Sequence, residues 1–150
     1  MTPEELAREI VNRVNEATWY DDGLWAIINA IAGAKVTYED DGSIIIRDKY
    51  MQGLIGYISF NELLGVNIPS KGFKTYIKKT KTCLKKLVKE ELSKEPVDLK
   101  DAMKKVLLYE PLNIKFNGKY EKAYNVYCII SETLGDWQDA AMEVAKELNY

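Results

Sequence analysis

The chain has 150 residues, of which 47% are hydrophobic, and a formal net charge of −2, which favours one folded domain over a disordered segment. It contains no histidine, and so lacks the commonest general base, the commonest metal ligand and every Ser-His or Cys-His nucleophile; we expect no enzyme and no cofactor. The longest apolar run, residues 24–33, is too short to cross a bilayer and the N-terminus carries no apolar leader, so we expect a cytoplasmic protein without membrane contacts.

Two helices are predicted at the start of the chain. A capping box that begins at Thr2, followed by apolar residues every three or four positions, predicts a helix over 3–17. Asp21 or Asp22 caps a second helix, which Gly33 ends. We expect these two helices to pair as a helical hairpin.

A small β lobe is predicted near residues 34–58, where the period of the apolar residues changes from helical to alternating. Residues 35–38 and 43–47 are predicted to form a β-hairpin around a turn that contains Gly42. The stretch 50–58 is either a strand or a loop packed on the core, because two glycines interrupt its apolar run.

Helices are predicted to fill most of the second half of the chain. A short helix over 59–65 precedes a long helix over 71–93. A further helix begins after Asp98 and ends before Pro111, since the residue before a proline avoids the helical region. Residues 112–116 alternate between apolar and polar types, a pattern that would add a strand to the earlier hairpin.

The last third of the chain allows two interpretations. Asn117-Gly118 is typical of a hairpin turn, but apolar and aromatic residues at helical spacing follow it, so a helix over 119–134 is preferred to a second long strand. Asp136 is expected to cap a final helix. Together the elements predict a mostly α fold, a helical bundle of about five to six helices with a small β-hairpin or sheet insertion (α+β), in a single domain over 1–150.

The segment from residue 71 to residue 105 is strongly basic, with twelve lysines against five acidic residues. On a helical projection the apolar residues of the long helix fall on one arc, and its lysines avoid that arc. A positive stripe along one flank of a core-facing helix suits a polyanion, because each lysine–phosphate contact releases counterions. The predicted nucleic-acid-binding residues are the lysines of this stripe: Lys71, Lys74, Lys78, Lys79, Lys81, Lys85, Lys86 and Lys89.

A solvated helix face is the simpler explanation of such a stripe. Lysine-rich faces usually carry glutamates at i,i+4 positions, however, and the segment 71–89 contains no acid, which favours nucleic-acid contact. Arginine is scarce, which favours contact with the nucleic-acid backbone over readout of base edges. Tyr76 lies at the edge of the apolar arc, where packing is favoured over stacking on a base.

Other candidate sites have simpler structural explanations. The acidic residues 39–41 lack the calcium-loop pattern, so they are expected to form an exposed turn and no metal site. Cys83 and Cys128 lie far apart with apolar neighbours at helical spacing, which favours two buried thiols over a disulfide. The tyrosines of the predicted helix 119–134 follow its core stripe and are expected to pack there.

The layout resembles the small subunits of CRISPR interference (Cascade) ribonucleoprotein complexes, in particular those of the archaeal type I-A effector. The shared features are a short, cysteine-poor and mostly helical chain, the hairpin 36–47, the lysine helix and a thermophile-like composition rich in lysine and glutamate. The resemblance implies a non-catalytic subunit in antiviral defence that associates with itself and with other effector subunits, and that contacts crRNA and the backbone of target DNA. Only the lysines match what this role requires.

Two alternatives stay open. A virus- or plasmid-encoded DNA-binding protein would need a recognition helix, and the sequence shows no helix-turn-helix with base-reading residues. A protein-interaction module, such as an inhibitor or a scaffold, would dock a basic partner on the acidic segment 1–70, which holds five basic and eleven acidic residues. Salt-dependent binding to nucleic acid separates these classes.

Overall fold

The computed structural model of this chain is described for most of its first 59 residues and for a long segment of its second half. The described ranges are 2–33, 35–38, 43–47, 54–59 and 73–131. They contain five α-helices, one 3-10 helix and three short strands, so the prediction of a mostly helical fold is confirmed. The predicted helix over 59–65, beyond its first residue, and the final helix after Asp136 lie outside the described residues.

The first helix, α1 (Pro3–Glu16), begins with the predicted capping box. The backbone N–H of Thr2 donates to Oε1 of Glu5 and the backbone N–H of Glu5 donates to Oγ1 of Thr2, each over 3.1 Å. The bond from the Thr2 backbone, and then that from its side chain, lowers the pKa of the Glu5 carboxyl because both favour its charged form. Reciprocal bonds of this kind satisfy two backbone donors that the first helical turn leaves unpaired.

The second helix, α2 (Asp22–Ala32), resolves the choice between two capping residues. Asp21 is the N-cap, since its Oδ1 accepts a hydrogen bond of 3.0 Å from the backbone N–H of Leu24. Gly33 ends the helix with φ of 109°, a left-handed conformation that glycine adopts without steric cost.

The predicted hairpin of α1 and α2 is wrong in its main contact. The principal neighbour of α1 is the lysine helix α4 (Phe73–Leu92), and its contact with α2 is slight. The core stripe of α1, which includes Leu6, Ile10 and Val14 at 0% exposure, has to cover the apolar arc of a helix far away in sequence. The pairing of α1 with α4 therefore follows from the apolar surface that the two helices bury against each other, and not from their order in the chain.

Three strands form an antiparallel sheet in the order β1-β2-β3. β1 (Lys35–Tyr38) and β2 (Ser43–Arg47) coincide with the predicted hairpin, and Val36 pairs with Ile46. The ambiguous stretch supplies β3 (Leu54–Ser59), which pairs with β2 and lies against α2. The register of β2 and β3 shifts between Ile46 and Arg47, which interrupts the regular pairing of the two strands.

The apolar arc predicted for α4 is confirmed. Thr80, Leu84 and Val88, spaced one turn apart, are each 0% exposed. The Thr80 hydroxyl donates to the carbonyl oxygen of Tyr76 over 2.8 Å, which satisfies a polar group that the core would otherwise leave unpaired. The arc packs on α1 and α2, so the remaining surface of α4 is left for solvent or a ligand.

The strand predicted over 112–116 is wrong. A 3-10 helix, η1 (Glu110–Leu112), is followed by Asn113 in a left-handed conformation with φ of 56°, and residues 113–117 form no regular element. Leu112 and Phe116, exposed by 1% and 9%, pack against the helical core. The alternation of apolar and polar residues therefore belongs here to an extended segment that crosses helices. A half-buried strand has the same alternation, so the sequence pattern alone does not distinguish the two.

The helix α5 (Leu99–Tyr109) begins as predicted after Asp98, whose Oδ1 accepts a hydrogen bond of 2.8 Å from the backbone N–H of Asp101. Each residue over 102–109 is buried, so α5 is the central helix of the core. A helix buried on all sides has to accommodate any charged residue that it carries.

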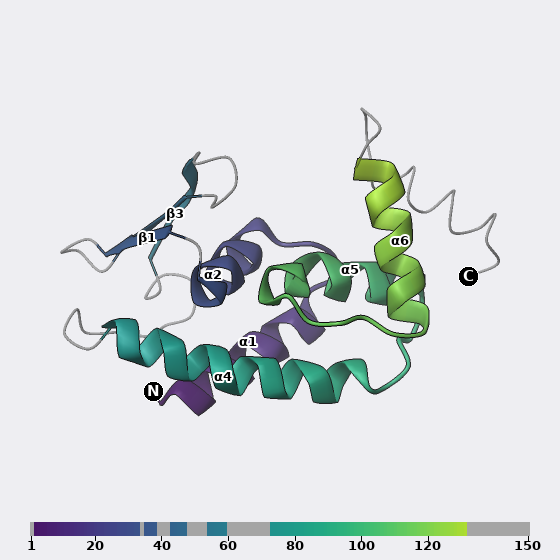
Figure 1. The fold of residues 1–150 in the computed structure, drawn as a ribbon, viewed down its shortest axis with the longest axis horizontal. Coiled ribbons are helices and arrows are strands. Elements are labelled where there is room, and N and C mark those ends of the chain that lie inside the picture. Colours follow the sequence, from purple (N-terminus) through teal and green to yellow (C-terminus); the bar gives the residue numbers. More distant parts are fainter. Residues whose placement is uncertain (1, 34, 39–42, 48–53, 60–72, 132–150) are drawn as a thin grey trace.

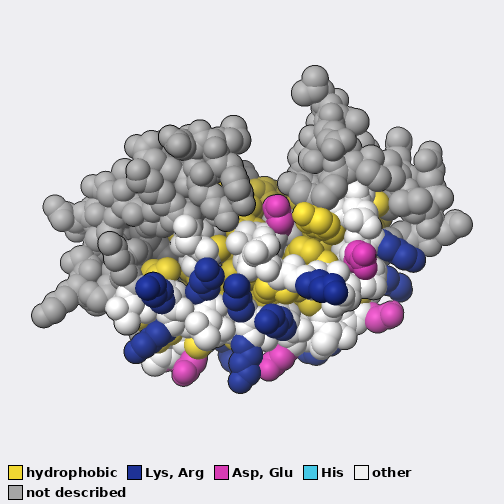
Figure 2. Space-filling model, viewed as in Figure 1, with side chains coloured by type: hydrophobic (Ala, Val, Ile, Leu, Met, Phe, Trp, Pro, Cys, Tyr) yellow, Lys and Arg dark blue, Asp and Glu magenta, His cyan; other side chains and the backbone are white. Residues whose placement is uncertain are grey.

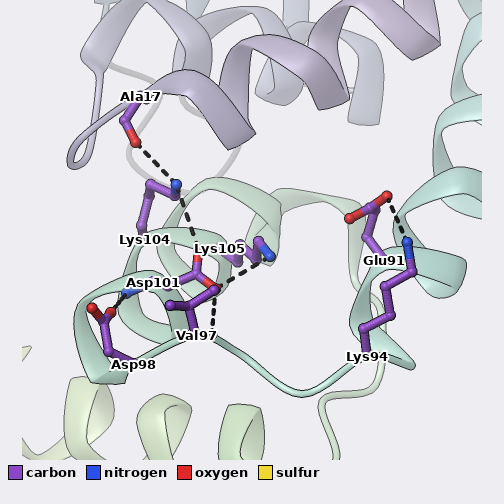
Figure 3. Close-up of polar contacts among 8 residues, drawn as sticks. All are labelled: Ala17, Glu91, Lys94, Val97, Asp98, Asp101, Lys104 and Lys105. Carbon is purple, nitrogen blue, oxygen red and sulfur yellow. Dashed lines mark hydrogen bonds and ion pairs between the residues drawn. The ribbon is translucent and has the colours of Figure 1, made fainter.

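Two lysines of α5 are buried and share one carboxylate (Figure 3). Lys104 and Lys105 are 5% and 9% exposed. The Oδ1 of Asp101 lies 3.5 Å from Lys104 Nζ, and its Oδ2 lies 3.3 Å from Lys105 Nζ. Lys104 Nζ also donates a hydrogen bond of 2.9 Å to the carbonyl oxygen of Ala17, which ties α5 to the end of α1. Charged groups withdrawn from water in this way require such partners.

The last described helix, α6 (Lys119–Ser131), decides between the two interpretations of the Asn117-Gly118 turn. Gly118 has φ of 59°, but the backbone N–H of Tyr120 donates to the carbonyl oxygen of Asn117, so the turn starts a helix. The helical spacing of Tyr120, Ala123 and Val126, all buried, outweighs the local preference of the dipeptide for a hairpin.

The helices form one layered body with the sheet at one end (Figure 1). α4 lies along the lower side of the view with α1 beside it, and α2 and α5 lie above α4. α6 packs against α5 and rises from the end of the body opposite the sheet. The segment 113–117 crosses the same side of the molecule as α4, which brings both to one face (Figure 1).

Two phenols in this core lead to a prediction about alkaline stability. The hydroxyl groups of Tyr109 and Tyr120 are buried and find no hydrogen-bond partner among the described residues. Burial raises the pKa of both phenols, that of Tyr120 to about 12. Because a tyrosine in the unfolded chain ionises near pH 10, the folded state should lose stability as the pH rises from about 10 towards 12.

Replacing Tyr120 with phenylalanine should shift the pH midpoint of alkaline unfolding upwards, since no phenol then has to stay protonated at that position. Circular dichroism followed against pH, with tyrosinate absorbance in parallel, measures this midpoint. Tyr76→Phe is the control, because Tyr76 is only partly buried and should move the midpoint less. Equal midpoints for Tyr120→Phe and the unchanged protein would contradict the prediction.

Candidate nucleic-acid interface

Six of the eight predicted lysines lie on α4 with described side chains, and all six reach solvent. Lys78, Lys79, Lys86 and Lys89 are exposed, whereas Lys81 and Lys85 are partly buried. Lys74 lies in the first turn of α4, and Lys71 lies outside the described residues. We refer to the six as the lysine face.

Helix geometry divides the lysine face into two rows. At 100° per residue, one row lies beside the buried arc, and the other lies farther round the helix. The first row consists of Lys78, Lys81, Lys85 and Lys89, and the second of Lys79 and Lys86. Tyr76 lies on the other side of the buried arc, where burial and then the charge of Glu5 on α1 raise the pKa of its phenol.

The lysine face carries uncompensated positive charge. Within the described ranges, none of its six ammonium groups forms an ion pair: the pairs found there involve basic residues elsewhere in the chain. The acidic residues of α4, Glu90 and Glu91, lie in its last turn, and Glu91 pairs with Lys94 over 3.7 Å. Unpaired cations repel one another on one helix, a cost that an anionic ligand removes.

Not every lysine of the basic segment belongs to this face. Lys104 and Lys105 are buried and neutralised in part by Asp101, so the charge balance counted over 71–105 overstates the positive charge available to a ligand. The signal that separates them was present in the sequence, since these two lysines lie in an otherwise apolar helix close to an acidic residue one turn earlier.

The structure adds one cation that the sequence prediction missed. Lys115 is exposed in the segment 113–117, between the buried Leu112 and Phe116. Figure 2 shows basic side chains over α4 and over this segment on the same face. The alternation of 112–116 would have marked Lys115 as outward-facing if it had been interpreted as an extended segment over helices.

The remaining candidates of the sequence have structural roles. Tyr120 is buried in the core, and the ring of Tyr124 stacks on Phe116 with centroids 5.5 Å apart, which agrees with packing. Cys83 is a free thiol, partly buried where a buried one was predicted. The acidic residues 39–41 lie outside the described residues, and the part of the chain with described residues holds no group of three or more side chains suited to a metal ion.

No helix in the described part of the chain combines the length and the apolar character needed to span a membrane. Comparison with protein-family models, with curated proteins and with solved structures found no match to this chain. A function therefore has to be inferred from the lysine face and its surroundings.

Proposed function

We propose that this chain is a non-catalytic protein that binds the phosphate backbone of nucleic acid through the lysine face of α4. The supporting observation is that six lysines on one helix all reach solvent and form no ion pair within the described residues. Lysine is suited to this task because its flexible stem and point charge neutralise phosphates without precise geometry.

Contacts of this kind carry no sequence information. Base-edge readout relies on bidentate donors such as arginine, and α4 contains no arginine. The lysine rows follow the helix axis, and Lys78 and Lys89 lie about 16 Å apart along it, which allows several consecutive phosphates to be contacted. We therefore propose a protein that holds a nucleic-acid strand in place independently of its sequence.

Within this proposal, the context that fits best is that of a small subunit of a CRISPR effector complex of the archaeal type I-A class, in the cytoplasm. Its partners would be other effector subunits, further copies of the same chain, and crRNA and target DNA. A single face with few contacts binds weakly by itself, and neighbouring subunits in an assembly raise the effective concentration. Purification from the native host, with sequencing of bound nucleic acid and identification of bound proteins, tests this context.

Replacing Lys78, Lys81, Lys85 and Lys89 together with glutamine should weaken binding to single-stranded and double-stranded nucleic acid. Each lost phosphate contact should reduce the slope of log affinity against log salt by roughly 0.7 to 0.9. Fluorescence anisotropy of labelled oligonucleotides over a series of salt concentrations measures both quantities. The fold should survive, because these side chains lie off the buried arc.

A matched control removes the same number of charges elsewhere, from exposed positions on α1, α5 and α6: Arg8, Arg13, Lys100 and Lys122, each replaced with glutamine. This control should keep most of the affinity and most of the salt slope. Equal losses in the two variants would show that binding depends on net charge alone. Recovery of a basic protein partner without nucleic acid, unaffected by the lysine variant, would instead support a protein-interaction module that uses the acidic segment 1–70.

A further inference from the structure

A second basic element lies beside the lysine face. The segment 113–117 leaves η1 at Asn113 and crosses the same side of the molecule as α4 (Figure 1). Its exposed Lys115 reaches solvent, and Figure 2 shows basic side chains over both elements on this face. A ligand on the face can therefore meet cations from two segments that are distant in sequence.

Partly buried apolar side chains reach the surface on the same face as these cations. Figure 2 shows hydrophobic side chains between the basic ones on this face. Leu92, on the lysine flank of α4, and Ile114, next to Lys115, are both only partly buried against the core. The face therefore combines positive charge with apolar area. A ligand that offers only charged groups would leave this apolar area in contact with water.

The form of nucleic acid that matches such a face has both phosphates and accessible bases. A duplex presents its phosphates on the outside and keeps its base faces stacked inside, so it can satisfy the lysines but cannot cover the apolar surface. A single strand carries unpaired bases whose faces cover apolar or aromatic side chains, while its phosphates meet flexible cations.

We infer that the lysine face binds single-stranded nucleic acid in preference to duplex, with phosphates held by the α4 lysines and Lys115 and with bases over the apolar surface between them. This inference rests on the proposed function, since it specifies the form of nucleic acid bound at the same face. The strand runs along α4, because the first lysine row follows the helix axis and Lys115 lies on the segment that crosses beside it.

Three labelled oligonucleotides of equal length test the inference by fluorescence anisotropy at one salt concentration: a mixed-sequence single strand, its duplex, and an abasic strand with the same phosphates. The single strand should bind about tenfold more tightly than the duplex, which corresponds to the gain from about one base contact. The abasic strand should lose that advantage, since it keeps the charges and lacks the bases.

The variant Lys115→Gln should weaken single-strand binding several-fold and reduce its salt slope by about 0.7. Arg8→Gln is the matched control, because it removes one charge from an exposed site on α1 and should leave both quantities nearly unchanged. Equal effects of the two variants would show that Lys115 does not contact the bound strand.

The outcomes separate this inference from the proposed function. Equal affinity for the single strand, the duplex and the abasic strand would overturn the inference and leave backbone binding in place. No salt-dependent binding of any oligonucleotide would overturn both. Tighter binding of an acidic polypeptide than of any oligonucleotide would also overturn both, in favour of an acidic protein partner.

Discussion

Replacing Asp101 with asparagine is expected to destabilise the protein by about 3–5 kcal/mol, because it leaves two buried ammonium groups without their shared counter-charge. Asp101 lies between Lys104 and Lys105, whose side chains are only 6% and 11% exposed (Figure 3). Neither lysine has another carboxylate within ion-pair distance among the described residues. Asparagine matches the shape of aspartate, so the loss measures charge and hydrogen bonding more than packing.

Denaturant unfolding at neutral pH measures this effect. Glu9→Gln is the matched control, since Glu9 also forms an ion pair, with Arg13 over 2.9 Å, but on the exposed surface of α1. Such surface pairs contribute about 0–1 kcal/mol, so the control should remain close to the unchanged protein. Similar unfolding free energies for Asp101→Asn and Glu9→Gln would show that the two buried lysines do not depend on Asp101 as their counter-charge.

A further apolar replacement tests the same cluster from the opposite side. Asp101, Lys104 and Lys105 can be replaced together, by leucine, methionine and methionine. This variant should recover much of the stability lost in Asp101→Asn, because a buried ion pair seldom contributes more to the free energy of unfolding than well-packed apolar residues of similar size. The bond from Lys104 to the carbonyl oxygen of Ala17 is lost in this variant, so recovery should be incomplete.

Replacing Leu84 with alanine is expected to destabilise the protein by about 2–5 kcal/mol, since it removes apolar contacts and leaves a cavity. Leu84 is 0% exposed in the middle of α4, where that helix packs on α1. Leu84 lies off the lysine face, so its replacement should affect nucleic-acid binding only through loss of the folded state. This effect should therefore appear only near the unfolding transition.

Two further variants set the scale for Leu84→Ala in denaturant melts. Leu84→Met conserves most of the volume and should cost less than about 1.5 kcal/mol. Val97→Ala changes a residue that is 91% exposed and should have little effect. An unfolding free energy of Leu84→Ala equal to that of Val97→Ala would contradict the placement of α4 against α1.

Most residues of the candidate site could be predicted from the sequence. At 100° per residue, Thr80, Leu84 and Val88 fall on one arc, which identified the buried side, and the lysines then had to lie elsewhere on the same helix. Lys115 could not be assigned in this way, because its position beside α4 depends on the path of a segment that lacks regular structure. Lys104 and Lys105 carry a sequence signal, an acidic residue one turn earlier in a largely apolar helix, but only the central position of α5 shows that both are buried.

The sequence by itself determined the elements whose signals are local. Thr2 and Asp21 cap helices through side-chain bonds to residues within one turn, and Gly33 ends a helix because it can adopt a positive φ. Apolar spacing over a few turns determined the buried faces of α1 and α4. These features depend on neighbours in the chain, and a sequence contains that information directly.

The tertiary structure alone decided how these elements meet. α1 packs on α4 although α2 follows it in the chain, and residues 112–116 cross the helical body although their alternation fits a strand. The turn before α6 starts a helix although Asn117-Gly118 favours a hairpin, since burial of Tyr120 stabilises the helical alternative. The physical reason is the same in each case: burial of apolar area between distant segments outweighs local preferences of at most about 1 kcal/mol per residue.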